Sequence, residues 1–220
     1  MARATRTYDS PLRDEHARLT RQRIIDAAHR MLLDGGYGAM TIGALAQEAG
    51  VSVQTVYNAV GSKADVVKAV YDVALAGDDE PVAMMERPAF RALLAERNPR
   101  RWFAHYAAFS RSIYDSVGPL VSVLVAQAAA GEPDLAEFAA TIERERATGT
   151  GRVAELYASR FPLRAGLTVD ETADILWTLT APEVADRLIR RRNWTADAYE
   201  AWLATTMADS IVGSRRVPTR

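Results

Sequence analysis

Apolar residues recur at every third or fourth position along most of the chain, and strict alternation of apolar and polar residues is rare. A spacing of three and four residues places apolar side chains on one face of an α-helix, whereas alternation is typical of a strand. The pattern therefore predicts an all-α fold. The first predicted helix runs from an N-cap at Thr20 to about Leu33, and Gly35-Gly36 ends it.

Two short capped helices are predicted next. Thr41 caps a helix that ends at Gly50, and Ser52 caps the helix that follows it. Two short helices joined by a tight turn form a helix-turn-helix, and glycine adopts the left-handed conformation that such a turn requires. We therefore predict a helix-turn-helix over residues 41–60, with its second helix suited to the major groove of DNA.

The sequence Gly-Asp-Asp-Glu-Pro at 77–81 separates two predicted domains. Before it, Ser62 begins a further helix, and Asp65 stands where it completes a capping box. After it the predicted helices are longer, and Gly118-Pro119 is expected to kink or split one of them. These helices cover residues 90–96, 100–130, 133–160, 169–179, 182–193 and 196–212. We expect a flexible N-terminal arm over 1–19, a three-helix helix-turn-helix domain over 20–76, and a larger helical domain over 80–213.

Composition narrows the possible functions. Hydrophobic residues make up 49% of the chain, which is enough for a substantial core, and the absence of cysteine excludes disulfides and thiolate metal sites. The net charge of −1 conceals an asymmetry, because residues 1–23 hold six basic and three acidic residues. No run approaches the roughly 20 apolar residues of a membrane span, and residues 1–23 lack the apolar centre of a secretory signal. We therefore expect a cytoplasmic protein without a membrane partner.

Catalytic and metal chemistry find little support in the sequence. The three histidines, His16, His29 and His105, lie in different segments, and the single Asp-x-x-His of Asp26 and His29 has no second motif to pair with. No glycine-rich phosphate loop and no nucleophile elbow occurs. We expect no cofactor, no metal and no enzymatic activity, and a helical enzyme or interaction module is the least favoured interpretation.

Several motifs follow one another in a fixed order between residues 20 and 76. They are Ile24-Ile25-Asp26-Ala27-Ala28, Gly35-Gly36-Tyr37, Thr41, the run from Ala46 to Ser52, Thr55-Val56-Tyr57 and Gly61-Ser62-Lys63. Their order and spacing resemble the TetR family of transcriptional regulators. In the second domain only the helical pattern and the stretch 176–184 look similar to that family. The resemblance implies a DNA-binding regulator whose larger domain binds a ligand and forms the dimer.

The resemblance also implies roles for individual residues. Thr41, Tyr57 and Lys63 would contact DNA phosphates, Lys63 at a helix start where anions are already favoured. The residues left to face base edges are Ser52, Val53, Gln54, Thr55 and Asn58. Val53 and Gln54 depart from the arginine and glycine that the family often carries there. Gln54 is suited instead to an adenine edge, and either Val53 or the methyl group of Thr55 to a thymine methyl group.

A stripe of aromatic residues in the second domain has two interpretations. It can be ordinary core packing, or it can line an apolar cavity with a few polar groups, where ligands bind in helical bundles. Because regulators of this family usually sense a small hydrophobic molecule, the resemblance adds support to the second interpretation, and both stay open. The candidate pocket residues are Trp102, His105, Tyr106, Phe109, Tyr114 and Trp177.

One helix-turn-helix contacts only a few base pairs, so two are expected to act on half-sites about 34 Å apart, or a multiple of that. This predicts a homodimer on a near-palindromic double-stranded operator. The apolar residues expected at the dimer interface are Ile175, Leu176, Leu179, Trp202, Leu203, Met207 and Ile211. The favoured function is a repressor that a small-molecule ligand releases from its operator. The alternative is a helix-turn-helix activator or a ligand-independent DNA-binding protein.

Overall fold

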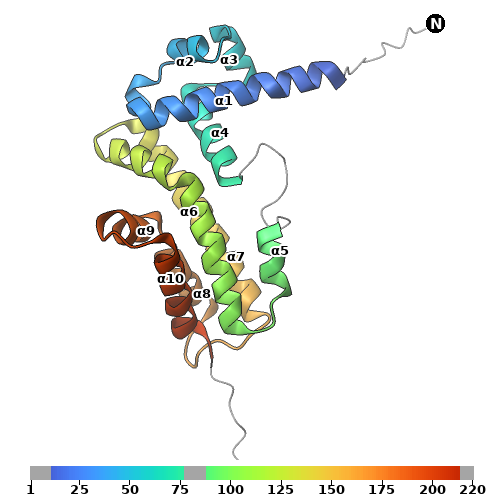
Figure 1. Ribbon diagram of the computed structural model, residues 1–220, viewed down its shortest axis with the longest axis vertical. Coiled ribbons are helices and arrows are strands. Elements are labelled where there is room, and N and C mark those ends of the chain that lie inside the picture. Colours follow the sequence, from blue (N-terminus) through green and yellow to red (C-terminus); the bar gives the residue numbers. More distant parts are fainter. Residues whose placement is uncertain (1–10, 77–87, 214–220) are drawn as a thin grey trace, which may run out of the picture. The chain divides into compact units, whose positions relative to one another are not determined.

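The computed structural model describes residues 11–76 and 88–213 of the chain. Within these ranges the chain forms helices and turns, with one isolated antiparallel bridge between Leu163 and Val212 (Figure 1). The predicted all-α fold is therefore confirmed. The chain divides into two compact units, Met1–Ala74 and Leu75–Arg220.

The first unit contains four helices in its described part, α1 (Pro11–Ala39), α2 (Ile42–Glu48), α3 (Val53–Ala59) and α4 (Lys63–Ala76). Helix α1 packs against both α2 and α3, and α2 packs against α3. The helical dihedral angles of α1 are interrupted at Gly36, where the sequence predicts an end to the helix. The fully buried side chains of this unit come from all four helices and their connections, among them Ile24, Leu32, Met40, Leu45, Val56 and Val66.

Helix α1 begins at Pro11, well before the predicted N-cap at Thr20. The structure thus places residues 11–19, where a flexible arm was expected, in a helix, while residues 1–10 lie outside the described residues. Residues 13–19 are all exposed, so no apolar stripe marks this part of the helix in the sequence. Proline at the first helical position and the ion pair between Arg18 and Glu15 at 2.9 Å favour the helix without burial.

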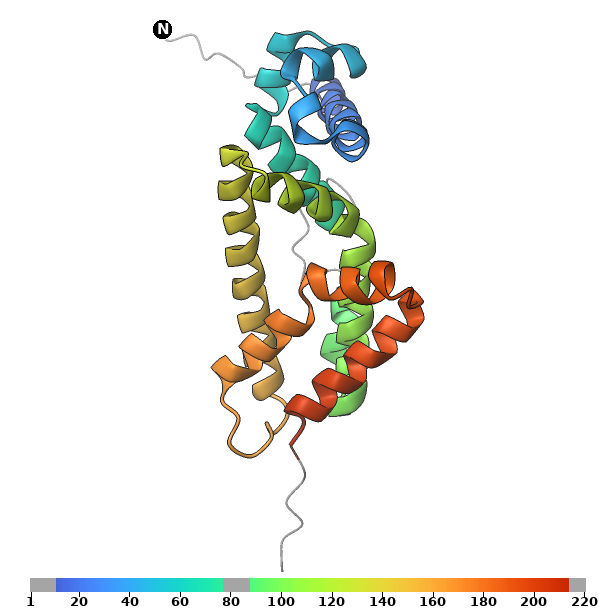
Figure 2. The same cartoon turned by 90° about the vertical axis from the view of Figure 1, so that its left-hand side faces the viewer.

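The second unit is built around α6 (Pro99–Ala129), which packs against four other helices. Those helices are α5 (Pro88–Ala95), α7 (Pro133–Ala158), α9 (Pro182–Asp186) and α10 (Ala196–Ile211). Helix α8 (Val169–Leu179) packs against α7 and α10, and the π-helical segment η2 (Arg187–Arg191) follows α9. Pro119 lies inside α6, which changes direction along its length but is not split (Figure 2).

The core of the second unit corrects the predicted dimer interface. Leu176, Leu203, Met207 and Ile211 are each 0% exposed and belong to the protomer's own core. Ile175, Leu179 and Trp202 are partly buried against the same core. The amphipathic pattern correctly identified the apolar faces of α8 and α10, but it did not show that α6 and α7 cover them.

Helix α6 is the one described helix that is long and apolar enough to cross a membrane by length and composition. Trp102, Phe103, Leu120 and Leu124 of this helix are 0–1% exposed. Because the helix also packs against α5, α7, α9 and α10, its apolar character is explained by its place at the centre of the second unit.

Candidate nucleic-acid interface and effector site

The two helices of the predicted helix-turn-helix start at the residues that the sequence indicates. The Oγ1 atom of Thr41 accepts a hydrogen bond from the Ala44 amide at 3.1 Å, and the Oγ atom of Ser52 accepts one from the Thr55 amide at 3.1 Å. Each bond satisfies an amide that has no partner within its own helix, so both predicted N-caps are confirmed.

The turn between α2 and α3 depends on Gly50, whose φ of +65° lies in the left-handed region. The amide of Val51 then donates to the Ala46 carbonyl at 2.9 Å and closes the turn. Ala46 is 3% exposed and Val56 is 0% exposed, so a small and a branched side chain fill the space at the crossing of the two helices. This packing fixes the direction in which the first turn of α3 points.

The first turn of α3 is exposed, as a DNA-reading helix requires. Val53 is 45% exposed and Tyr57 is 50% exposed, although Val56 between them is fully buried. The Nε2 atom of Gln54 donates to the Oδ1 atom of Asn58 at 2.9 Å, which pre-orients both amides on the outer face. Thr55 is half-buried, and its hydroxyl lies 2.8 Å from that of Ser52. The structure therefore brings these residues together on the outer face of α3.

Helix α4 begins with the predicted capping box. The amide and the hydroxyl of Ser62 both donate to Oδ2 of Asp65, at 2.8 and 2.7 Å, and the Asp65 amide donates back to the Ser62 hydroxyl at 3.3 Å. The hydrogen bonds from Ser62 lower the pKa of the Asp65 carboxyl. The Nζ atom of the next residue, Lys63, lies 3.7 Å from the centre of the Tyr37 ring.

The contact with Lys63 gives Tyr37 a second role that the sequence analysis missed. The sequence places Tyr37 in a turn motif, and in the structure its buried ring also holds the lysine by a cation–π interaction. An aromatic residue directly after a glycine pair, with a lysine at the start of a later helix, is the only sequence signal for this pairing.

A profile of the family described as bacterial regulatory proteins, tetR family, matches residues 24–70. The match covers α2, α3 and the capped start of α4, together with the part of α1 that packs on them. Residues 24–70 are therefore similar to the DNA-binding domain of the TetR family. Members of this family are DNA-binding transcriptional regulators and not enzymes, which agrees with the predicted helix-turn-helix.

Solved structures support the TetR fold over both units. NalD from Pseudomonas aeruginosa, the secondary repressor of the MexAB-OprM efflux pump, has a TM-score of 0.65 and 19% identity, over 90% of this chain and 98% of its own. A regulator from Saccharomonospora viridis in complex with choline has a TM-score of 0.62 and 16% identity, over 90% and 100%. The SmeT–triclosan complex has a TM-score of 0.65 and 17% identity, over 88% and 92%. No curated protein sequence matches the chain.

In the second unit, three of the six candidate pocket residues lie together. The rings of Trp102 and Tyr106 are 5.8 Å apart, and those of Tyr106 and Phe109 are 6.4 Å apart. Tyr114 contacts Tyr199 of α10 instead, at 6.5 Å between ring centroids. Trp177 is 38% exposed on α8, with the guanidinium of Arg146 5.5 Å from its ring.

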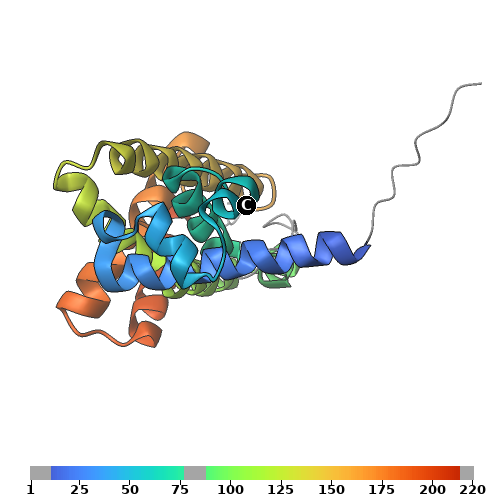
Figure 3. The same cartoon turned by 90° about the horizontal axis from the view of Figure 1, so that it is seen from above.

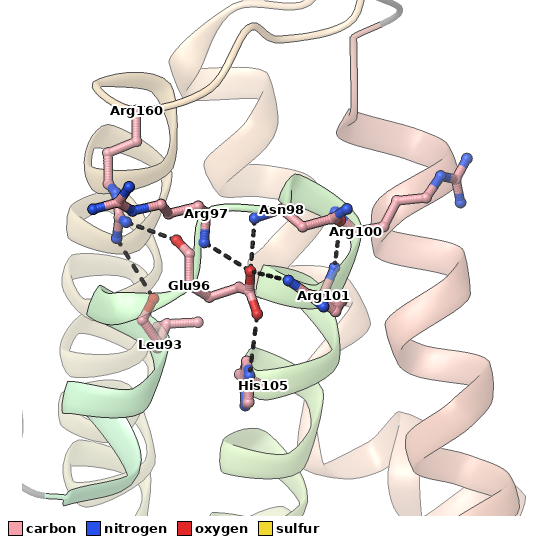
Figure 4. A network of polar contacts seen from close by, with 8 residues as sticks. All are labelled: Leu93, Glu96, Arg97, Asn98, Arg100, Arg101, His105 and Arg160. Carbon is pink, nitrogen blue, oxygen red and sulfur yellow. Dashed lines mark hydrogen bonds and ion pairs between the residues drawn. The ribbon is translucent and has the colours of Figure 1, made fainter.

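His105 lies outside the aromatic cluster, in a polar network at the start of α6 (Figure 4). Its side chain is 46% exposed, and its Nε2 atom is 3.7 Å from a carboxylate oxygen of Glu96. Glu96 also accepts hydrogen bonds from the amides of Arg97 and Asn98, both at 2.7 Å, which lower the pKa of its carboxyl. The candidate residues His105 and Trp177 are therefore not brought together with the buried rings.

Two buried polar atoms in the aromatic cluster have no hydrogen-bond partner among the described residues. They are Nε1 of Trp102 and Oη of Tyr157, on side chains that are each 0% exposed. Their rings are 5.2 Å apart. Burial raises the pKa of Tyr157 to about 12, so its hydroxyl stays protonated and able to donate at neutral pH. The sequence analysis missed Tyr157, which lies one helical turn from the buried Val153 on the apolar face of α7.

Proposed function

We propose that this TetR-family regulator is a repressor that binds a near-palindromic double-stranded operator as a homodimer and leaves it when a small hydrophobic effector binds. The observation that carries the proposal is the exposed first turn of α3, which Ser52 caps and the buried Val56 anchors. A helix presented in this way fits the major groove, with its N-terminal residues at base edges.

The residues that would contact DNA divide into two groups. The first group would bind phosphates. Thr41 lies at the start of α2, Tyr57 on the outer face of α3 and Lys63 at the start of α4. The residues that would face base edges are Ser52, Val53, Gln54, Thr55 and Asn58. Because Asn58 accepts a hydrogen bond from Gln54, the Gln54 amide is oriented before DNA binds and fits an adenine edge.

The two groups predict different effects on binding. Removing the Tyr57 hydroxyl by Tyr57→Phe should weaken binding to every duplex by a similar factor, because a phosphate contact carries no sequence information. Gln54→Ala should instead relax the preference at one base pair in each half-site. Fluorescence anisotropy with an operator and its single-base variants measures both. Equal weakening by Gln54→Ala on all duplexes would contradict the assignment.

A homodimer follows from the need for two readers, and the outer faces of α8 and α10 remain for its interface. On α10 the exposed residues Ala198, Ala201 and Thr205 form one line at helical spacing, and on α8 Trp177 is exposed. Ala201→Arg should therefore yield a monomer in sedimentation velocity, with the same helix content as the parent protein. A monomeric parent protein that binds one operator copy with full affinity would contradict the dimer.

The unpaired donors of Trp102 and Tyr157 support an effector site in the second unit, because buried polar groups normally have a partner. Structural neighbours that bind triclosan and choline agree with a ligand-binding role for this fold. The effector would be an apolar molecule with a hydrogen-bond acceptor. It must prefer the protein state in which the two readers no longer match the operator, since equal affinity for both states shifts nothing.

A release assay tests this site. Apolar molecules that carry a carbonyl, phenol or ether group are screened for release of labelled operator DNA. A releasing molecule should act more weakly on Tyr157→Phe or Trp102→Phe, whose operator affinity is unchanged in its absence. If the molecule releases DNA from both variants as readily as from the parent protein, the assignment is refuted. Because operator DNA is its partner, we also infer that the protein acts in the cytoplasm.

A further inference from the structure

Helix α1 extends far beyond the part of the first unit that it helps to bury (Figures 1 and 3). Its first fully buried side chain is Ile24, yet the helix begins at Pro11. Residues 13–19 are all exposed. A helix of this kind gains little from burial, so the character of its exposed side chains indicates what it can bind.

Three arginines of α1 lie in one sector of the helix surface. At 100° per residue, Arg13 lies about 20° from Ile24, and Arg21 and Arg23 lie about 60° and about 100° from Ile24 on opposite sides. Of the acidic residues of the extension, Asp14 lies on the same line as Arg21, at the edge of this sector. Glu15 lies on the opposite side and pairs with Arg18 at 2.9 Å.

The basic sector continues the face of α1 that packs against the DNA-reading helices. Ile24 and Ala27 are 0% exposed on this face, and α1 packs against α2 and α3. Arg13 on the same line therefore lies on the side of α1 where α3 lies. Within the described residues, neither it nor Arg21 nor Arg23 forms an ion pair, so their guanidinium groups are available to a partner.

We propose that the extension of α1 is a second DNA-binding element, in which Arg13, Arg21 and Arg23 bind phosphates outside the base pairs that α3 reads. The inference rests on the proposed function. From Ile24 to Arg13 the helix runs about 16 Å at 1.5 Å per residue, which corresponds to about five base pairs. The partner is the duplex backbone, because a face that holds three arginines, with Ala17 as its one apolar residue before Ile24, favours phosphate over a protein surface.

The salt dependence of binding tests this proposal. Affinity is measured between about 50 and 200 mM salt for the parent protein and the triple variant Arg13→Gln, Arg21→Gln, Arg23→Gln. Each lost phosphate contact reduces the log–log salt slope by about 0.9, so the slope should fall by about 2.7 for each bound subunit. The matched control removes three exposed arginines of the second unit, Arg91→Gln, Arg144→Gln and Arg152→Gln, and should keep the parent slope.

Duplex length provides the second measurement. The parent protein should bind an operator with about ten flanking base pairs more tightly than one cut flush with its half-sites, and the triple variant should bind both equally. An unchanged slope, or an equal loss of affinity on flush and flanked duplexes, would overturn the proposal while leaving the operator reader intact. A parent protein that binds no duplex would instead overturn the proposed function as well.

Discussion

The turn at Gly50 allows a stability prediction that depends on backbone geometry alone. Gly50 has a φ of +65°, and a Cβ atom added there would meet no atom within 4 Å. Gly50→Ala therefore creates no clash, and its effect is the conformational cost of placing a residue with a Cβ in the left-handed region. That cost is about 1–2 kcal/mol. The variant should fold to the same structure with a less stable helix-turn-helix.

Two other glycines of the same unit give a graded comparison. Gly43 lies in α2 and does not have a positive φ. The atom nearest to a Cβ added at Gly43 is Oγ1 of Thr41, at 4.0 Å. Gly43→Ala should thus be neutral or stabilising by up to about 1 kcal/mol. Gly61 combines a φ of +127° with an added Cβ only 2.5 Å from Asp65 Oδ2, so Gly61→Ala should destabilise more than Gly50→Ala.

Hydrogen exchange measured by mass spectrometry on peptides from 41–60 follows the opening of this unit separately from the second. A loss of 1–2 kcal/mol should speed the exchange of the protected α2 and α3 amides by about 5- to 30-fold in Gly50→Ala. Exchange that is unchanged or slower in Gly50→Ala would refute the reasoning. So would an equal acceleration in Gly43→Ala.

Three further predictions concern the second unit. Thr168→Ala removes the acceptor for the Glu171 amide at 3.1 Å and should cost about 1 kcal/mol, a fall of about 2–4 °C in Tm, whereas Thr178→Ala on the exposed face of α8 should leave the Tm unchanged. Arg160→Met removes the donor to the Glu96 carbonyl at 2.7 Å and should speed hydrogen exchange of the α5 amides. Arg152→Met, at an exposed arginine, is the control, and equal exchange in the two variants would count against a stabilising role of this hydrogen bond. Burial raises the pKa values of Tyr106, Tyr157 and Tyr199 to about 12, so the stability that their neutral forms provide is complete below pH 10 and lost as the pH rises towards 12. In an alkaline absorbance titration these three should ionise together with unfolding, and ionisation near pH 10 in the folded protein would contradict their burial.

Local signals in the sequence predicted the DNA-reading part well. Thr41, Ser52 and the Ser62–Asp65 pair cap their helices as expected, because a cap depends on residues only three positions apart. The same holds for Thr168 and Glu171, whose reciprocal hydrogen bonds open α8. Features determined within one helical turn can be inferred without knowledge of the fold.

Features that depend on partners distant in sequence were not predictable in the same way. The apolar face of α10 was recognised, but only the fold shows that Leu203 and Met207 are covered by the protomer's own core. The start of α1 was not predicted for the opposite reason, because residues 13–19 are exposed and show no hydrophobic periodicity in the sequence. His105 lies in an aromatic stretch of sequence, yet its position on α6 places it beside Glu96 on an exposed face.

The most direct test of the account is a selection from randomised duplex DNA, carried out in parallel with the parent protein and Gln54→Ala. The parent protein should enrich a near-palindromic motif with two half-sites about one helical turn, or a multiple of one, apart. Gln54→Ala should enrich the same motif with one position in each half-site no longer specified. Failure of the parent protein to enrich any sequence, or an unchanged motif at every position with Gln54→Ala, would contradict the claim that the first turn of α3 reads the operator.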